Sequence, residues 1–349
     1  MSRAACFVVL TLAAASPASS DPYLEVDRAA LAAFNAQHLS GMGLAIYDAS
    51  GVQRFEKMYG DFSPDKRVAI ASASKLVAGL TLLRLVDAGK LSLHSTTGSV
   101  LGWTGPQAAI TLEQLLSFTS GLKPEASCTL RTAISLADCV ETIGKTPLAA
   151  APGTRFDYGS THLQVAARMA EIVTGKSWHS VFVAELREPL ALSADIGWYT
   201  WPRQAVGTSN PLIAGGLRMT MSEYARVLDL EYHRGVYHAE RLISDALFTA
   251  QATEPYPHAI IGSSPVKRIG LDYHYGLASW LECPPPAQNC ALQSSPGAFG
   301  FTPWVDRRGG YYAILGMEAG GTGRAGVVKF SVELAQQLRP LIRAAVAKN

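Results

Sequence analysis

The sequence predicts an α+β sandwich, with one antiparallel sheet built from both chain ends and a mostly helical lobe between them. Three observations lead to this prediction. Residues 42–59 have the pattern of a β-hairpin, residues 310–317 form a second apolar strand near the end of the chain, and apolar stretches with helical spacing occupy the middle. We therefore expect a single unit over residues 21–349, with its helical lobe at about 72–270.

The first elements follow from hydrophobic spacing. Apolar residues repeat along one face of a helix over 24–38. Two alternating strands then flank the turn Asp48-Ala-Ser-Gly51, which predicts the hairpin. Residues 76–86 are apolar almost all round, and such a helix belongs in the middle of a core.

Later helices are marked by their starts. Thr111 with Gln114 and Thr161 with Gln164 have the spacing of capping boxes, which predicts a helix beginning at each threonine. A last helix is expected over 330–346, after the strand at 310–317 and a glycine-rich turn.

The N-terminus resembles a secretory signal over residues 1–20. Arg3 precedes a short apolar stretch, and small residues follow it at 16–20. The apolar stretch is too short to cross a bilayer comfortably. We expect a secreted or periplasmic protein with no membrane span after cleavage; the alternative is an uncleaved anchor.

The nearly balanced charge of the chain argues against attraction to polyanionic partners. The 349 residues carry 30 basic and 28 acidic side chains, a net charge of +2, with no block of like charges. No global field therefore draws the chain to nucleic acid or anionic lipid.

Four cysteines remain after the predicted cleavage, an even number that suggests disulfides in an oxidising compartment. They are Cys128, Cys139, Cys283 and Cys290. Three pairings are possible. The simplest closes two short loops, joining Cys128 to Cys139 and Cys283 to Cys290.

Ser72-Ala-Ser-Lys75 is the first chemical signal. A serine hydroxyl is a poor nucleophile until a base takes its proton. Residues three apart share a helix face, so Lys75 can reach the oxygen of Ser72. Burial and the positive end of the helix dipole both lower the pKa of a lysine, which then serves as a base near neutral pH.

The same spacing occurs at Ser63–Lys66 and Ser264–Lys267. Both of these serines precede a proline in a polar, turn-like segment. Because only Ser72 leads into an apolar helix, we predict Ser72 as the nucleophile.

The context of Ser72 resembles the serine β-lactamase-like superfamily, which contains class C β-lactamases, D-alanyl-D-alanine carboxypeptidases and related esterases. RVAIASASKLVAGLTLLRLVDAGKLSL is similar to the nucleophile segment of that superfamily. Further similar segments follow in the family's order and span roughly residues 40–330. They are ITLEQLLSFTSGL at 110–122, PGTRFDYGS at 152–160, AGGLRMTMSEYARVL at 214–228 and GAFGFTPWVDRRGGYYAILGM at 297–317.

This resemblance implies a tyrosine that shuttles protons, which corresponds to Tyr158. A cationic Lys75 nearby would favour its anion. Ser160 replaces the usual Asn as a substrate-binding residue, and Phe118 stands where a His is common. Relatives that cleave esters or amide oligomers also carry Ser at this position.

The family's Lys-Thr-Gly motif, whose cation holds a substrate carboxylate, is absent. Its equivalent is Ser295-Pro296-Gly297, with Ser295 and Gly297 expected to contact substrate. The resemblance also implies an oxyanion hole formed by the backbone N–H groups of Ser72 and Ala298.

Other catalytic classes lack their motifs. No Gly-x-Ser-x-Gly elbow occurs, the histidines have no metal-binding spacing, and the glycine pattern at 321–326 is too near the end for a dinucleotide fold. We expect no metal and no cofactor. His162, just after the predicted cap, is expected to be solvated.

Together these features predict an exported serine hydrolase that works through an acyl-enzyme on Ser72. Without the cation, we expect small esters or uncharged amides ahead of β-lactams or D-Ala peptides as substrates. The alternative is a non-catalytic, penicillin-binding-like sensor or binding module on the same fold.

Overall fold

In the computed structural model, which describes residues 21–201, 208–317 and 324–348, the main sheet has seven strands. Their order is β2-β1-β13-β12-β11-β10-β9, and every neighbouring pair is antiparallel. The predicted combination of strands from both chain ends is therefore confirmed. The strands are β1 (Gly41–Asp48), β2 (Gln53–Gly60), β9 (His274–Tyr275), β10 (Trp280–Leu281), β11 (Leu292–Ser294), β12 (Thr302–Asp306) and β13 (Tyr311–Met317).

The central strands are buried on both faces. β1 and β13 pair in register from Met42 with Met317 to Asp48 with Tyr311. Along β13, Tyr312 and Ile314 join the larger hydrophobic core, whereas Ala313 and Leu315 join the smaller one. This period of two places one core on each side of the sheet.

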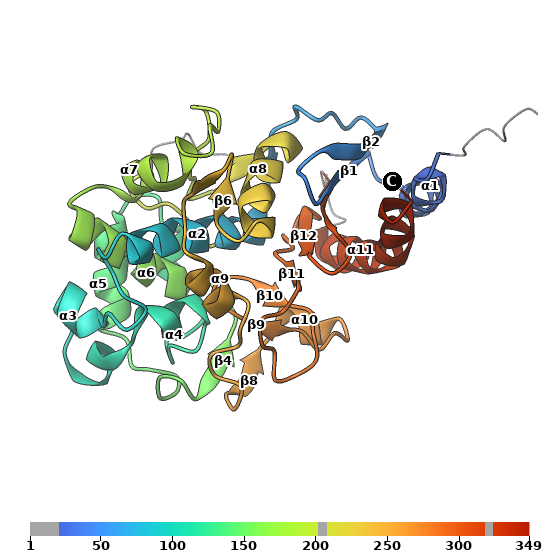
Figure 1. Cartoon of the computed structure of the whole chain (residues 1–349). Coiled ribbons are helices and arrows are strands. Elements are labelled where there is room, and N and C mark those ends of the chain that lie inside the picture. The colour runs from blue at the N-terminus through green and yellow to red at the C-terminus, as the bar shows by residue number, and fades with distance from the viewer. Residues whose placement is uncertain (1–20, 202–207, 318–323, 349) are drawn as a thin grey trace, which may run out of the picture.

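Two terminal helices cover one face of the sheet. α1 (Leu24–Gln37) and α11 (Arg324–Val346) lie together on that side in Figure 1, opposite the other helices. The helix predicted at 24–38 is confirmed. The last helix begins earlier than the predicted residue 330, and the glycine-rich turn before it lies largely outside the described residues.

The other face carries the helical lobe. Its α-helices are α2 (Ser74–Asp87), α3 (Thr97–Leu101), α4 (Leu112–Leu116), α5 (Leu136–Gly144), α6 (Thr161–Thr174), α7 (Trp178–Phe182), α8 (Met221–Tyr232), α9 (Asp245–Gln251) and α10 (Pro265–Arg268). Shorter turns are the 3-10 segments η1 (Ala71–Ala73), η2 (Gly105–Ala109) and η3 (Ser127–Leu130) and the π-helical η4 (Val183–Arg187). Most residues of α2 are buried, as its apolar sequence predicts.

The two predicted capping boxes have different outcomes. At α4, Thr111 accepts from the N–H of Gln114 and the Gln114 side chain accepts from the N–H of Thr111, as predicted. At α6, the helix does begin at Thr161, but no side chain caps it. Gln164 instead donates to the carbonyl of Pro211 at 2.7 Å, so a tertiary contact replaces the local one.

Three small sheets join distant segments. β3 (Val68–Ala69) pairs with β5 (Arg218–Met219), and β4 (Arg155–Asp157) runs parallel to β8 (Ile260–Ser263). These two pairings hold the segments before Ser72 and before Tyr158. The third joins β6 (Val236–Tyr237) to β7 (Glu240–Arg241).

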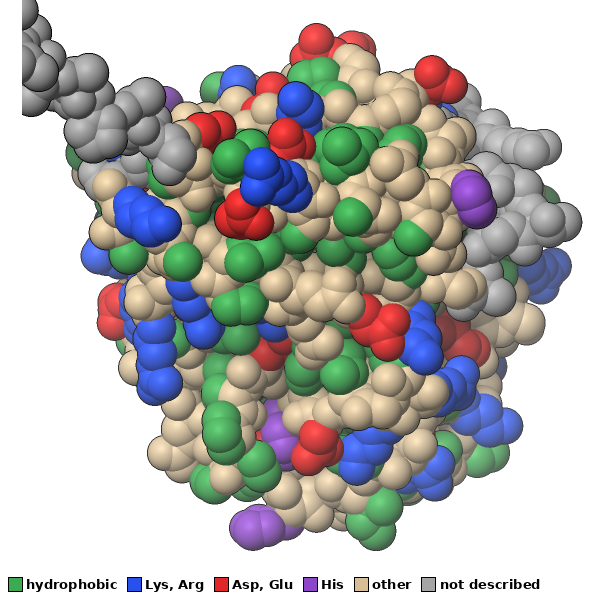
Figure 2. Space-filling model, turned by 90° about the vertical axis from the view of Figure 1, so that its right-hand side faces the viewer, with side chains coloured by type: hydrophobic (Ala, Val, Ile, Leu, Met, Phe, Trp, Pro, Cys, Tyr) green, Lys and Arg blue, Asp and Glu red, His purple; other side chains and the backbone are tan. Residues whose placement is uncertain are grey.

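Two disulfides close the short loops that the spacing favoured. Cys128 is bonded to Cys139, and Cys283 to Cys290. The predicted signal segment, residues 1–20, lies outside the described residues. Within the described part of the chain, no helix combines the length and apolar character needed to cross a bilayer. Figure 2 shows one face of the molecule, on which basic and acidic side chains are interspersed.

Candidate active site

Ser72 and Lys75 lie at the start of the buried helix α2. Ser72 belongs to the turn η1, which runs directly into α2, and Lys75 is in the first turn of that helix. The Nζ of Lys75 lies 3.0 Å from the Oγ of Ser72. Ser74, one of the two residues between them, has a different role, since its hydroxyl accepts a hydrogen bond from the N–H of Leu217. The three-residue spacing therefore brings the two predicted side chains together.

Burial changes the chemistry of Lys75. The residue is only 3% exposed, and its Nζ also donates to the carbonyl oxygen of Ala214 at 2.9 Å. Burial lowers the pKa of Lys75 to about 7, although the carboxylate of Glu125 acts in the opposite direction. A lysine with this pKa is partly neutral at pH 7, so it is able to accept a proton from the Ser72 hydroxyl.

Tyr158 joins this pair from another part of the chain. It follows β4, and its N–H donates to the carbonyl of Ser263 in β8 at 2.8 Å. The Nζ of Lys75 lies 4.6 Å from the centre of the Tyr158 ring. The ring stacks on Trp280 at 5.1 Å and meets the edge of Phe118 at 5.3 Å. These aromatic contacts hold the ring beside the lysine.

The protonation of Tyr158 differs from the prediction. We expected Lys75 to favour the phenolate, but burial raises the pKa of Tyr158 well above 10, and a hydrogen bond with Ser72 only partly offsets this. The prediction is wrong because a buried phenolate loses more hydration than a half-neutral lysine can replace. The phenol stays protonated and can donate a proton.

The loop after Tyr158 is fixed by the segment that contains Pro124. The carbonyl oxygen of Pro124 accepts from the N–H groups of Ser160 and Thr161, at 2.9 and 3.1 Å. A Cβ on Gly159 would lie 2.1 Å from the same oxygen, so this position requires glycine. Ser160 is half-buried next to Tyr158.

The loop between β11 and β12 reaches the nucleophile from the sheet. The hydroxyl of Ser295 donates to the carbonyl oxygen of Ser72 at 3.4 Å. Gly297 donates its N–H to the carbonyl of Phe301 at 2.7 Å, so that N–H is already used within its own turn. The next residue, Ala298, is exposed. Its N–H remains the candidate oxyanion donor on this loop, which is the role that the family resemblance implies.

His162 is buried, contrary to the expectation of a solvated side chain. It is 1% exposed; its Nδ1 lies 2.7 Å from the hydroxyl of Ser120, and its Nε2 lies 2.8 Å from the carbonyl of Asp157. Burial lowers the pKa of His162 to about 4, and the charge of Lys75 adds to this. Phe118 stacks on the imidazole at 5.0 Å and shields it from solvent.

Several residues near the pair were missed by sequence reasoning. Trp280 supports the Tyr158 ring, Ala214 offers its carbonyl to Lys75, and Glu125 acts electrostatically on both Lys75 and Tyr158. No local motif marks them. Only the segments that resemble the family gave a signal, because Ala214 opens one of them.

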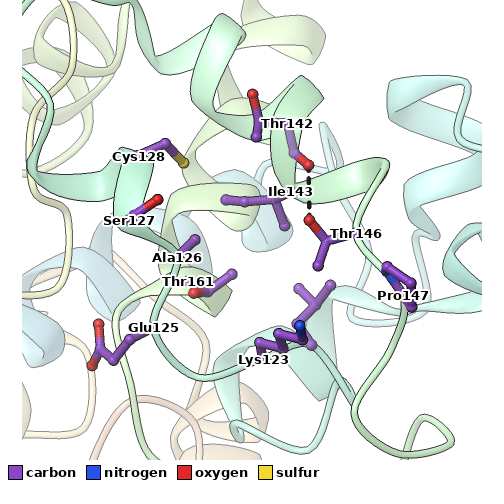
Figure 3. A pocket seen from close by; sticks show the side chains of 11 residues that line it. Lys123, Glu125, Ala126, Ser127, Cys128, Thr142, Ile143, Thr146, Pro147 and Thr161 are labelled. Carbon is purple, nitrogen blue, oxygen red and sulfur yellow. Dashed lines mark hydrogen bonds between the residues drawn. The ribbon is translucent and has the colours of Figure 1, made fainter.

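A pocket of about 300 Å³ lies beside the segment that carries Pro124. Its walls come from residues 122, 123 and 125–128, from the end of α5 with Thr146 and Pro147 after it, and from Thr161 (Figure 3). The disulfide between Cys128 and Cys139 ties this wall to α5. The hydroxyl of Thr161 is buried and makes no hydrogen bond within the described residues. No group of three or more potential metal ligands occurs in the described ranges.

Comparison with known sequences places these features in a wider context. The sequence model of the Beta-lactamase family matches residues 27–328. Penicillin-binding protein 4 of Amycolatopsis lactamdurans is 30% identical over 141 residues, which cover 39% of this chain and 36% of that protein. Teichoic acid D-alanine hydrolase of Staphylococcus aureus is 27% identical over 183 residues, 50% of this chain and 44% of that protein. The chain thus spans less than half the length of these curated relatives.

Solved structures share the fold over almost the whole chain. A Bacteroides dorei protein provisionally named a β-lactamase superposes with a TM-score of 0.76 and 26% identity, covering 89% of this chain and 98% of that one. EstCE1, a hydrolase with promiscuous acyltransferase activity, has a TM-score of 0.72 and 16% identity over 93% and 98% of the two chains. A penicillin-binding protein homologue from Caulobacter crescentus has a TM-score of 0.70 and 18% identity over 93% and 99%.

Proposed function

Because the chain belongs to the beta-lactamase family, we propose that it is an exported serine hydrolase that forms an acyl-enzyme on Ser72. The observation that carries this proposal is the 3.0 Å contact between the Nζ of Lys75 and the Oγ of Ser72. The lowered pKa of Lys75 supplies the base that the serine needs. The relatives include named hydrolases, which supports a hydrolytic reaction.

In the acylation step, Lys75 takes the proton of the Ser72 hydroxyl while the oxygen attacks the substrate carbonyl carbon. The backbone N–H groups of Ser72 and Ala298 then hold the oxyanion. Each such donor lowers the free energy of the transition state by about 3 kcal/mol. The bond to the leaving alcohol or amine breaks as Tyr158 gives that group a proton. Lys75 returns a proton to Tyr158, and the acyl group remains on Ser72.

In the deacylation step, a water molecule replaces the departed alcohol or amine. A proton of this water passes to the same two groups, Lys75 and Tyr158, while the water oxygen attacks the acyl carbon. The bond between the acyl carbon and the Ser72 oxygen then breaks. Ser72 recovers its proton, and the carboxylic acid leaves. Each turnover therefore consumes one water and splits one ester or amide bond.

The substrate class follows from position 295. A serine there offers a hydrogen bond but no positive charge, so a substrate carboxylate would lose a charge-assisted partner worth roughly 1.5–3 kcal/mol. We propose that Ser295, Gly297 and Ser160 contact small ester or amide substrates without a carboxylate at this point. β-Lactams and D-Ala-D-Ala peptides, which carry one, are expected to be poor substrates.

Export is part of the proposal. Residues 1–20 would be removed as a signal peptide, which leaves one hydrolase domain over 21–349 in a secreted or periplasmic location. The two disulfides support an oxidising compartment.

The test is hydrolysis of a p-nitrophenyl ester by the wild type and by Ser72→Ala. Matched controls are Ser63→Ala and Ser264→Ala, because both serines have the same spacing to a lysine. We expect activity to be lost in Ser72→Ala alone. Equal rates for wild type and Ser72→Ala would refute the proposal, and a stable adduct on Ser72 without turnover would favour the non-catalytic sensor.

A further inference from the structure

Glu125 is an exposed acid without a partner of its own. Its carboxylate makes no hydrogen bond or ion pair within the described residues. An exposed carboxylate usually has no role beyond hydration. This one is held close to the proposed reaction centre by its neighbours in the chain.

The backbone places Glu125 beside the tyrosine loop. The preceding residue, Pro124, accepts hydrogen bonds from the N–H groups of Ser160 and Thr161. These bonds, together with the contact between Pro124 and Gly159, lock the two loops against each other. The backbone at Glu125 is therefore held beside the loop that follows Tyr158, and the Glu125 side chain lines the pocket that also contains Thr161.

The charge of Glu125 affects the pKa of two residues of the site. It raises the pKa of both Lys75 and Tyr158, against the effect of burial at the lysine. Lys123, two residues away on the same loop, is not among the groups that shift the pKa of Lys75 or Tyr158. In Figure 3, Glu125 extends to the side of the pocket opposite Thr146 and Pro147.

The loop between β11 and β12 contributes no positive charge at position 295. Position 295 carries Ser in place of the lysine found in the Lys-Thr-Gly motif, and the Ser295 hydroxyl contacts the backbone of Ser72. At neutral pH the buried Lys75 is only partly charged. A substrate near Ser72 thus meets the negative field of Glu125 without a fixed cation at position 295.

We propose that the substrate carries a protonated amine and that Glu125 is the specificity-determining residue that pairs with it. This inference rests on the proposed function of Ser72 and names its substrate class. The amine can belong to the acyl part or to the alcohol part of an ester, and the two sources are separated by experiment. Because Glu125 is exposed to solvent, we expect the pair to change kcat/KM by about 5-fold.

The experiment compares matched esters that differ in one charge. For the acyl part, benzyl esters of ω-amino acids with chains of several lengths are each compared with the isostere in which a methyl group replaces the ammonium. For the alcohol part, the 2-aminoethyl ester of hexanoic acid is compared with its propyl ester. The measured quantity is the ratio of kcat/KM for the amine to kcat/KM for its isostere.

The ratio isolates the role of Glu125 in recognition. Glu125→Gln also lowers the pKa of Lys75, but this affects both members of a pair and cancels in the ratio. We expect the wild type to prefer the amine in at least one pair, and Glu125→Gln to lower that ratio about 5-fold. Glu125→Lys should invert the preference, and the control Lys123→Gln should leave the ratio unchanged.

The outcomes separate this inference from the proposed function. If no ester is cleaved in a Ser72-dependent manner, the proposed function fails and this inference with it. If Ser72-dependent cleavage occurs but every amine ratio is at or below one, or Glu125→Gln leaves the ratios unchanged, only the inference is overturned.

Discussion

The backbone of Gly297 packs directly against the carbonyl oxygen of Ile70. A Cβ built on Gly297 would lie 2.1 Å from that oxygen. Ile70 lies two residues before Ser72, and its N–H donates a hydrogen bond to the carbonyl oxygen of Leu217 at 3.1 Å. The loop after β11 and the nucleophile turn are thus in contact through backbone atoms, which sets the distance between the two proposed oxyanion donors.

Gly297→Ala should therefore disrupt the site more than its small size suggests. The added methyl must displace the backbone of Ile70 or of its own loop, and such overpacking costs about 1–3 kcal/mol. We expect a lower melting temperature and a large loss of ester hydrolysis. Gly326→Ala is the control, because a Cβ there meets nothing within 4 Å. Full activity in Gly297→Ala would show that this close contact is not needed.

The pH dependence should reflect Lys75. Because burial lowers its pKa to about 7, kcat/KM should rise with pH through an acid limb near pH 7 as the amine loses its proton. Glu125 raises this pKa, so Glu125→Gln should move the limb to lower pH, and Lys123→Gln should not. A limb that stays at the same pH in Glu125→Gln would contradict the electrostatic coupling.

Removing the phenol should affect catalysis rather than folding. Tyr158→Phe keeps the ring that stacks on Trp280, so stability should change little. Loss of the proton donor should lower kcat/KM by about 10²-fold or more. Tyr256→Phe, whose hydroxyl bonds to Glu113 instead, should retain activity. Steady-state kinetics and thermal unfolding of both variants give the answer, and comparable kinetics for the two would exclude the proposed role.

Acid should destabilise the fold through His162. Its pKa falls from 6.5 to about 4 on folding, so between these values the unfolded chain binds a proton that the folded one does not. The free energy of unfolding should thus decrease by about 3 kcal/mol as the pH falls through this interval. His162→Gln should be less stable at pH 7 but should lose this slope, whereas exposed His94→Gln should keep it. Denaturant unfolding at several pH values measures the difference.

Local periodicity accounts for what could be predicted of the fold. The hairpin, the helix α2 and the strand β13 each have a hydrophobic pattern strong enough to specify them without their neighbours. The cap at Thr161 failed because Gln164 finds partners about fifty residues away, at Pro211 and Ile213. Such contacts leave no trace in the local sequence.

The same distinction applies to the site. The proximity of Ser72 and Lys75 follows from three-residue spacing, and that of Tyr158 was expected only from the family resemblance. The burial of His162 depends on Phe118, and the position of Glu125 depends on hydrogen bonds made by Pro124. The segment around Glu125 has the composition of an ordinary solvated loop, so its electrostatic role becomes visible only in three dimensions.

The most direct measurement is the site at which an activated-serine probe modifies the protein covalently. After a short pulse with a fluorophosphonate, which bonds to an activated serine oxygen as fluoride leaves, intact-mass and peptide-mass spectrometry locate the adduct. The account predicts one adduct per chain, on Ser72, and none in Ser72→Ala. An adduct on another residue, or no adduct in a protein that still hydrolyses esters, would contradict it.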